Sequence, residues 1–385
     1  MSLNSTNLKI APAPNLQEII YTNANSYFDN IINAINLAEK SIDLEVYIFD
    51  NDDLSKRVVE ALIQAAKRNI HVRVLIDGVG ACTDFYYIAK QLLKAGAEVK
   101  IFHPLPWHIE QWRLSLSHSK GLEKFLHLLA SINQRDHRKL ILIDQRSAWL
   151  GSFNISQKHL PKKYKGQHWR DTAIEVTGID LEALNIAFEA CWCKWSKKQT
   201  ALHLTKTPFI FNFTRSLRIE QRKRLLERIQ KASEKIWITN AYFVPDKHLL
   251  EALAYASYRG VDVRILLPRI SDIFFIPWAS SYFYGRLLKS GARIFEFQNR
   301  VLHAKTLIID DWAIIGSSNL NRRSLRHDLE LDYSLQLPES KKELAKSFEV
   351  DLNESEELAA KNFEQSRIWQ RILGGILVFL LARWV

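Results

Sequence analysis

Apolar and polar residues alternate along the chain in two patterns, one typical of helices and one typical of buried strands. In LSKRVVEALIQAAKRN (residues 54–69), apolar positions three and four apart predict an amphipathic helix. The next segment, HVRVLID (71–77), is a short apolar run rich in branched side chains and predicts a strand. IINAINLAEK (31–40) and IDLEVYIF (42–49) give the same order. Alternating helices and strands predict an α/β fold.

The pattern occurs twice in the chain. Each copy predicts helix, strand, helix, strand, helix and strand, followed by one further strand. We therefore expect two pseudo-twofold-related halves, each a mostly parallel or mixed sheet flanked by helices. The matching segments are 38–49 with 232–243, 68–76 with 259–267, and 92–99 with 287–294.

The repeat divides the chain into three regions. We expect a first half at residues 1–200, a second half at 201–345 and a C-terminal helical segment at 346–385. The first half carries an insertion at about 106–134, which includes a helix-like run at 121–132. This insertion is either a helix packed on the domain surface or a lid that covers the site or touches a membrane.

The C-terminal region ends in an apolar run, Ile372 to Ala382, flanked by arginine and tryptophan residues. Eleven residues of helix extend only about 16 Å, whereas the hydrocarbon core of a bilayer is about 30 Å thick. Such flanking residues favour a membrane–water interface, so we expect a membrane-associating tail. The alternative is a helix docked on the core.

The composition is that of a globular protein with an anionic partner. The 385 residues are 47% hydrophobic and 25% charged, which excludes a disordered chain and a polytopic membrane protein. A net charge of +11 favours nucleic acid or an acidic membrane surface. The three cysteines show no metal-binding spacing, and the N-terminus shows no signal-peptide pattern.

One motif closes each half of the repeat. Residues 137–154 read HRKLILIDQRSAWLGSFN, and residues 303–319 read HAKTLIIDDWAIIGSSN. Side chains two apart in a strand share a face, so His137 projects with Lys139, and His303 with Lys305. The apolar runs after the lysines anchor the strands in a core, with Asp144 and Asp310 at their far ends. The two copies predict two half-sites of one active site.

These residue types suit the chemistry of a phosphodiester. Two lysines and two Ser/Asn pairs provide donors for the non-bridging oxygens and for the charge of a pentacoordinate phosphorus. One imidazole can attack phosphorus while the other protonates the leaving alkoxide. No acidic cluster for divalent cations accompanies these residues, so we expect a reaction without metal or cofactor. The serine and asparagine pairs are Ser152 with Asn154 and Ser317 with Asn319.

At these residues the chain resembles the phospholipase D superfamily, whose pattern is H-x-K-x4-D followed by G-S-x-N. The stretches at 238–253, 259–268, 278–310 and 316–331 further resemble bacterial cardiolipin synthases. The resemblance covers nearly the whole chain except the leader and the insertion. It implies the short, membrane-peripheral type, without N-terminal transmembrane helices.

The resemblance assigns roles to the motif residues. It implies that His137 is the nucleophile and His303 the general acid and base, in a catalytic set completed by the motif Lys and Asp residues. The lysines and the Ser/Asn pairs are implied to bind the phosphate. Asp171 and Glu330 occupy the positions of acidic residues that orient the imidazoles; the alternative for both is an ordinary salt bridge.

The implied activity is a cardiolipin synthase-like phosphatidyl transfer. A phosphatidyl group passes from phosphatidylglycerol through phosphohistidine to a second phosphatidylglycerol, with release of glycerol. The alternatives are a phosphodiesterase that hydrolyses phospholipid or nucleic acid, and a catalytically silent membrane scaffold. We expect anionic phospholipids and a membrane surface as partners, with no specific nucleic acid and no obligate protein partner. The expected location is the cytoplasmic side of the bacterial inner membrane, peripheral or tail-anchored.

Overall fold

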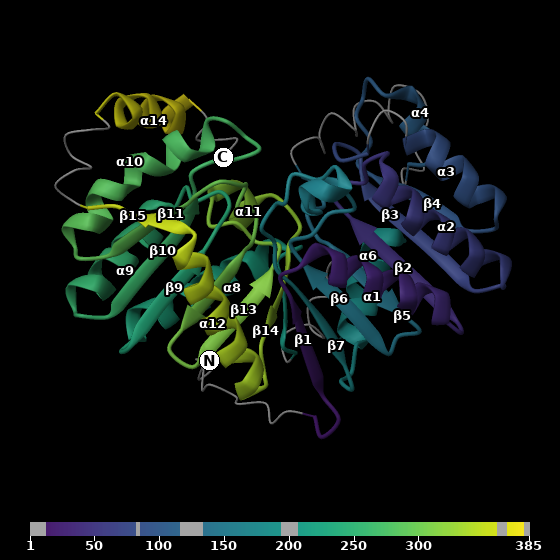
Figure 1. Ribbon diagram of the computed structural model, residues 1–385, viewed down its shortest axis with the longest axis horizontal. Coiled ribbons are helices and arrows are strands. Elements are labelled where there is room, and N and C mark those ends of the chain that lie inside the picture. The colour runs from purple at the N-terminus through teal and green to yellow at the C-terminus, as the bar shows by residue number, and fades with distance from the viewer. Residues whose placement is uncertain (1–12, 82–84, 116–133, 194–206, 360–367, 381–385) are drawn as a thin grey trace.

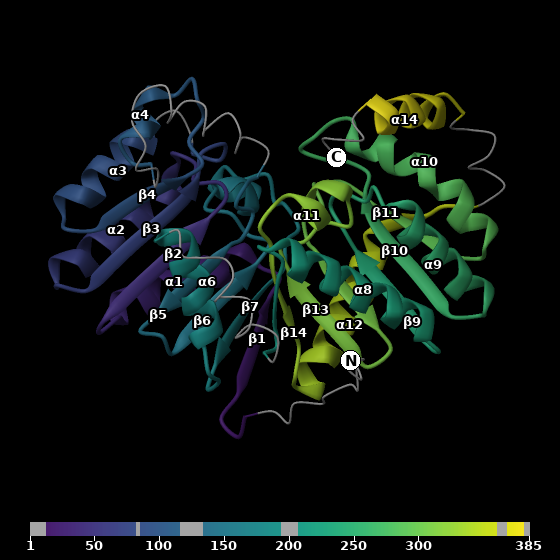
Figure 2. The ribbon, with the colours of Figure 1, turned by 180° about the vertical axis from the view of Figure 1, so that it is seen from behind.

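The computed structural model describes residues 13–81, 85–115, 134–193, 207–359 and 368–380, which form two similar halves side by side (Figures 1 and 2). Each half contains one mixed sheet. The first sheet has the order β1 (Gln17–Tyr21), β7 (Ala173–Thr177), β6 (Ser147–Gly151), β5 (Leu140–Ile143), β2 (Ser41–Val46), β3 (His71–Asp77), β4 (Glu98–Phe102). The second has the order β15 (Ser355–Glu357), β11 (Arg293–Phe297), β10 (Asp262–Pro268), β9 (Lys235–Thr239), β12 (Thr306–Ile309), β13 (Trp312–Gly316), β14 (Leu331–Ser334), β8 (Phe209–Phe211).

The two sheets share one topology. Strands β2, β3 and β4 run parallel, as do β9, β10 and β11. The motif strands β5 and β12 pair antiparallel with β2 and β9 and begin the antiparallel parts of their sheets. The predicted α/β class, the two related halves and the mixed sheets are confirmed.

Helices cover one face of each sheet, and the other faces meet in a shared core. The outer face of the first sheet packs against α1 (Ala24–Leu37), α2 (Asp53–Lys67) and α3 (Phe85–Lys94). The corresponding helices of the second half are α8 (Arg215–Lys231), α9 (Lys247–Tyr258) and α10 (Ile276–Lys289). Residues of both sheets, together with α6 (Glu182–Trp192) and α12 (Pro338–Asn353), form one continuous apolar core. This core joins the two halves.

Three short helical segments follow β6 and β13, the strands after the motif strands. They are η1 (Gln157–His159) and η2 (Lys162–Tyr164) in the first half, and α11 (Arg322–Arg326) in the second. Residues 106–115 and 134 of the predicted insertion are described, and they include a single helical turn, α4 (Ile109–Trp112). The helix expected at 121–132 lies outside the described residues, and the division of the chain at residues 200 and 345 stays a prediction.

The C-terminal apolar run is largely contained in α14 (Ile368–Leu380), which packs along α10 (Figure 1). A side chain at Gly374 would collide with the backbone of Trp278, so this glycine permits the close approach of the two helices. Ile372, Leu373, Ile376 and Phe379 remain exposed on α14. Within the described residues, every helix is too short or too polar to span a membrane.

Candidate active site

Both motif histidines lie where the two halves meet. The backbone N–H of His137, just before β5, donates to the carbonyl oxygen of Leu329 at 2.9 Å. The backbone N–H of His303, just before β12, donates to the carbonyl oxygen of Arg170 at 2.8 Å. Leu329 and Arg170 belong to the opposite halves, and each directly precedes a carboxylate predicted to orient a histidine. Each motif segment is thereby fixed to the opposite half across the junction.

The carboxylates reach across that junction. Nδ1 of His137 lies 3.0 Å from Oε2 of Glu330, and Nδ1 of His303 lies 2.7 Å from Oδ1 of Asp171. All four side chains are buried. An ionised carboxylate only accepts hydrogen bonds, so each Nδ1 carries the proton and each Nε2 is left for chemistry. Each half therefore supplies one imidazole and the orienting group of the other half's imidazole.

The two motif lysines are buried beside the imidazoles. Nζ of Lys139 donates to the carbonyl oxygen of His137 at 2.6 Å, and Nζ of Lys305 donates to that of His303. Burial, together with the charge of Lys305, lowers the pKa of Lys139 to about 7, and burial lowers the pKa of Lys305 to about 8. The repulsion that Lys305 exerts on Lys139 indicates that the two ammonium groups face the same site. An anion between them would relieve it.

The side-chain oxygens of both motif asparagines accept backbone N–H groups. Oδ1 of Asn154 accepts the backbone N–H of Ile48 at 3.1 Å, and Oδ1 of Asn319 accepts that of Tyr242 at 3.2 Å. These bonds fix the orientation of both amides, because the oxygen is already used. In the part of the chain that the structure describes, neither Nδ2 is assigned a protein acceptor, so both suit a phosphate oxygen.

The motif serines, which the sequence predicts as phosphate ligands, form hydrogen bonds within the protein. Oγ of Ser152 donates to the carbonyl oxygen of Thr172 at 3.1 Å and accepts its N–H at 3.0 Å. Oγ of Ser317 donates to Oε2 of Glu330 and accepts the N–H of Leu331 at 3.0 Å. Both hydroxyls are thus committed to holding the strand that carries the orienting carboxylate. We assign them to support of the site rather than to contact with substrate.

The motif aspartates, which the sequence predicts as part of the catalytic set, bind backbone amides. Asp144 and Asp310 lie at the ends of β5 and β12 opposite to the imidazoles. The carboxylate of Asp144 accepts the backbone N–H groups of residues 39–41 at 2.7–2.9 Å. Asp310 accepts those of residues 233–235 at 2.9–3.0 Å. Against the effect of partial burial, these bonds lower the pKa of both carboxyls. The aspartates fix the turns that enter β2 and β9.

Replacing Asp144 with alanine is therefore expected to reduce stability and to spare catalysis. The change removes three hydrogen bonds from backbone amides and places alanine at a φ of 53°, which disfavours side chains without a local hydrogen bond. We expect a loss of about 2 kcal/mol in the free energy of unfolding, measured by urea denaturation. Asp144→Asn, which keeps an acceptor oxygen, should lose less. A large fall in kcat at full folding would return Asp144 to the catalytic set.

Two tyrosines complete the walls of the site. The ring of Tyr47 lies 5.0 Å from that of His137, and the ring of Tyr242 lies 6.3 Å from that of His303. Nζ of Lys139 lies over the Tyr47 ring at 5.2 Å. No motif in the sequence singles out these tyrosines, although both fall seven residues after the aligned lysines of the repeat.

A third histidine was also missed. His159, at the end of η1, donates from Nδ1 to Oδ2 of Asp171 at 2.7 Å, and its Nε2 accepts the backbone N–H of Asn154 at 3.2 Å. Ser324 occupies the corresponding place in the second half, accepting the N–H of Asn319 at 2.9 Å. The signal was the equal spacing of five residues after each motif asparagine.

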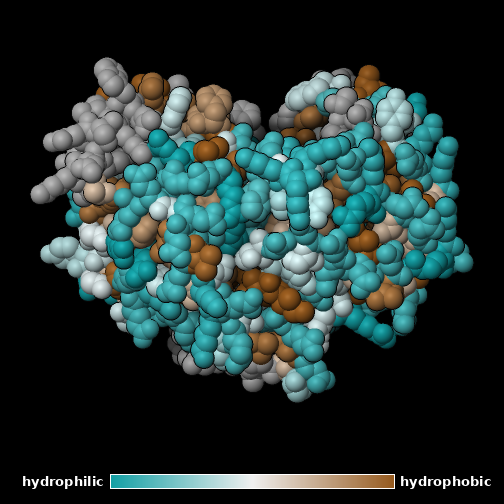
Figure 3. Space-filling view, viewed as in Figure 1, coloured by the Kyte–Doolittle hydropathy of each residue, from teal (hydrophilic) through white to brown (hydrophobic). Residues whose placement is uncertain are grey.

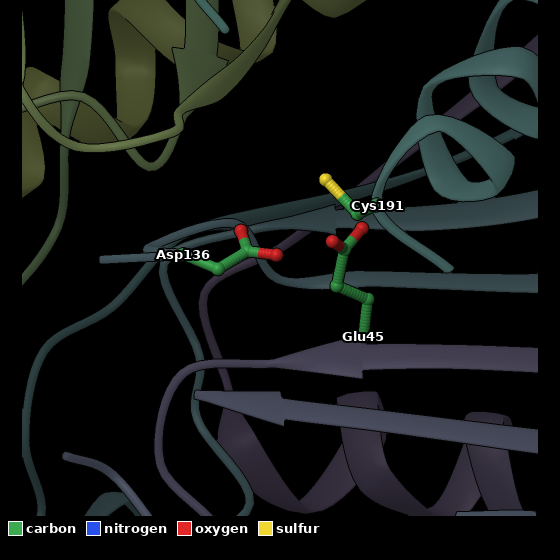
Figure 4. Close-up of side chains that lie close together, drawn as sticks. All are labelled: Glu45, Asp136 and Cys191. Carbon is green, nitrogen blue, oxygen red and sulfur yellow. The ribbon is translucent and has the colours of Figure 1, made fainter. Parts of the chain in front are cut away.

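A cluster of possible metal ligands lies behind the first motif. One ligand atom each from Glu45, Asp136 and Cys191 fall within 4.8 Å of one another (Figure 4). However, the guanidinium of Arg138 donates to all three side chains. Arg138 alternates with His137 and Lys139, so it points to the opposite face of the strand. We assign the cluster to stabilising this face of the first half, because its oxygen and sulfur atoms already bind the buried guanidinium of Arg138.

The fold and the site together define an enzyme of the phospholipase D class. A sequence model described as "Cardiolipin synthase, PLD-like domain" matches residues 31–168 and 225–352. The chain therefore belongs to the cardiolipin synthase family of phospholipase D-like proteins, as its motifs predicted.

Relatives and a solved structure agree with this family. The chain is 31% identical over 370 residues to a cardiolipin synthase of Clostridium perfringens strain 13, covering 92% of this chain and 74% of that protein. It is 30% identical over 366 residues to the major cardiolipin synthase ClsA of Bacillus subtilis strain 168, covering 92% and 72%. The structure of a phosphatidylserine synthase from Haemophilus influenzae Rd KW20 superposes with a TM-score of 0.69 at 13% identity, covering 95% and 94%. This last likeness supports the fold alone.

Proposed function

We propose that the chain is a cardiolipin synthase-like phosphatidyltransferase that uses a phosphohistidine intermediate. The observation that carries the proposal is the crossed arrangement, in which two buried imidazoles, each held at Nδ1 by a carboxylate of the opposite half, flank two buried lysines. This set offers one nucleophile, one acid and a cationic cradle for a single phosphodiester.

In the first step, Nε2 of His137 attacks the phosphorus of phosphatidylglycerol. The bond from phosphorus to the glycerol oxygen breaks, its electron pair goes to that oxygen, and His303 donates a proton from Nε2. In the second step, His303 takes the proton from the hydroxyl of a second phosphatidylglycerol. That oxygen attacks phosphorus, and the P–N electron pair returns to His137. Lys139 and Lys305, with the amides of Asn154 and Asn319, hold the non-bridging oxygens.

The electrostatics of the two pairs support this division of roles. Although burial acts to raise it, His303 and His159 hold the pKa of Asp171 well below its usual value, so Asp171 stays ionised. Burial and the charge of Lys305 lower the pKa of His303, and Asp171 opposes this lowering and so favours an imidazolium on His303. Burial raises the pKa of Glu330 to about 7, so it supplies less negative charge. Burial and the charge of Lys139 lower the pKa of His137 well below its usual value. A neutral imidazole is the form that attacks.

The reaction is tested by incubating purified protein with phosphatidylglycerol vesicles and identifying the products by mass spectrometry. The expected products are cardiolipin and glycerol in equal amounts. Phosphatidic acid in place of cardiolipin would instead assign the hydrolase alternative, in which water is the acceptor. Cleavage of labelled DNA with no change in the lipid would overturn the lipid assignment.

The lysine pair predicts how anion binding depends on pH. A bound anion favours the ammonium form, whereas the empty site gives pKa values of about 7 and about 8. Affinity is therefore highest below pH 7 and falls as the lysines lose protons at higher pH. We expect the Kd of sulfate, measured by calorimetry, to rise about tenfold per pH unit between pH 7 and 8, where one lysine has lost its proton, and more steeply above pH 8. Lys305→Met should flatten this dependence; equal sulfate affinity at pH 6.5 and 9 in the wild type would contradict it.

We also propose that exposed apolar side chains at the edges of the molecule beside the active site bind the membrane surface. Val79 and Phe274 are exposed in the loops after the equivalent strands β3 and β10, at the edge that carries the histidines. Helices α4 and α14 lie at the two upper corners in Figure 1, and Figure 3 shows apolar side chains at both corners with hydrophilic ones between. The exposed basic residues of the stretch at 161–165 suit an anionic surface between these edges.

The membrane edge is tested by sedimentation with vesicles of phosphatidylglycerol and phosphatidylcholine. Phe274→Ser combined with Phe379→Ser is expected to weaken binding about tenfold or more, because each change removes an exposed aromatic ring from the edge. Tyr258→Ser is the matched control, since Tyr258 is 81% exposed at the far end of α9. Equal effects of the two changes would contradict the proposed edge.

A further inference from the structure

The two halves carry the same hydrogen-bonded connection behind their catalytic pairs, but with different side chains. In the second half, the hydroxyl of Ser324 accepts the backbone N–H of Asn319 and donates to Oε1 of Glu330, which holds His137. In the first half, His159 makes both contacts, to the N–H of Asn154 and to Asp171, which holds His303. Each connection joins a motif asparagine to the orienting carboxylate of the opposite imidazole.

The protonation of His159 follows from its partners. An N–H group donates to Nε2, so Nε2 is unprotonated, and the proton resides on Nδ1, which donates to Asp171. His159 is 1% exposed, and its ring lies among those of Phe153 at 5.2 Å and Trp169 at 5.6 Å. These rings hold the imidazole in place, and no solvent competes for its hydrogen bonds.

Asp171 therefore receives one N–H on each oxygen, from His159 and from His303, both at 2.7 Å. Donation to both oxygens fixes the plane of the carboxylate and favours its ionised form. Without His159, one oxygen of a buried carboxylate and the N–H of Asn154 would both lose a partner. The carboxylate would then be free to rotate away from the line of the His303 Nδ1–H bond.

We infer that His159 is a positioning residue for proton transfer by His303. His159 acts through Asp171, and it joins that carboxylate to Asn154, which is predicted to bind the phosphate. The inference rests on the proposed function, in which His303 protonates the leaving glycerol oxygen and His137 attacks phosphorus. It assigns His159 to the acid–base step and Ser324 to the nucleophilic step.

The test compares two substrates that differ in their need for a proton. In bis(p-nitrophenyl) phosphate, His137 forms the P–N bond and p-nitrophenolate leaves with its electron pair without protonation. In phosphatidylglycerol, the glycerol oxygen needs the proton of His303. We expect His159→Leu to lower kcat/KM about 100-fold for phosphatidylglycerol and less than about 5-fold for bis(p-nitrophenyl) phosphate. Retained activity on the second substrate also reports that the variant is folded.

Two further variants separate positioning from packing. His159→Gln offers both a donor and an acceptor, so we expect it to recover kcat/KM for phosphatidylglycerol to within about 10-fold of the wild type. Ser324→Ala acts through the nucleophile, and should lower kcat/KM for both substrates by similar factors. The inference is overturned if His159→Leu lowers both substrates equally, or if leucine preserves activity better than glutamine.

The products that the wild-type protein forms distinguish a failure of the proposed function from a failure of this inference. If wild-type protein makes no cardiolipin or phosphatidic acid from phosphatidylglycerol, the lipid assignment fails. If it does, and the His159 variants do not divide the two substrates as described, the lipid assignment stands and the positioning role is wrong.

Discussion

Replacement of His137 with alanine is expected to abolish phosphatidyl transfer. In the proposed mechanism, this change removes the nitrogen that bonds to phosphorus. It also leaves Glu330, which lies 3.0 Å from Nδ1 of His137, without an imidazole to orient. We expect kcat to fall at least about 10⁴-fold, and no acid-labile phosphate adduct to form on the protein. Rapid acid-free digestion followed by mass spectrometry measures the adduct directly.

His303→Ala is the informative counterpart. It should also abolish turnover of phosphatidylglycerol, but it should still release p-nitrophenolate from bis(p-nitrophenyl) phosphate and retain an adduct on His137. An adduct on His303 in the His137→Ala variant would reverse the assigned roles. Equal loss on both substrates in both variants would show that neither residue is specific to one step.

The second large effect is expected from Asp171→Asn. Each oxygen of Asp171 accepts an N–H, one from His159 and one from His303. Asparagine replaces one of these oxygens with an NH₂ group, which cannot accept a hydrogen bond. His303 therefore loses its fixed tautomer or its orientation. By analogy with the aspartate of serine protease triads, kcat should fall by about 10³–10⁴. The measurement is the initial rate of cardiolipin formation, with circular dichroism to report folding.

Asp144→Asn is the matched control for this change. It makes the same chemical replacement on the same half, at the far end of β5, where the carboxylate binds backbone amides rather than an imidazole. We expect it to keep kcat within about twofold. If Asp171→Asn were as active as this control, the crossed hydrogen bond would have no catalytic role.

Much of the fold and part of the site could be predicted from local sequence. Apolar runs between amphipathic helices predicted the parallel strands, and the repeat indicated which strands are equivalent in the two halves. Alternation in the motif strand placed His137 with Lys139 and turned Arg138 to the other face, where it binds Asp136 and Glu45. These features depend on spacing within a few residues, which the sequence displays directly.

The remaining features depend on contacts between distant segments. Asp144 follows its histidine by seven residues, yet its carboxylate binds the turn before β2, which no local pattern indicates. The serine hydroxyls likewise bond to β14 or to the residue before β7. His159 resembled any lysine-flanked surface histidine, because its partner Asp171 lies twelve residues further on. Only the folded chain brings these groups together.

The crossed imidazole–carboxylate pairs have a consequence for how such a duplicated chain can diversify. If one half formed a homodimer, symmetry would make both pairs identical, and any substitution would alter donor and acceptor chemistry at once. Fusing the copies in one polypeptide removes that constraint, so an imidazole can stand at residue 159 while a hydroxyl stands at residue 324. The two histidines of the repeat can therefore take different catalytic roles through single amino-acid changes at residues that lie behind the site.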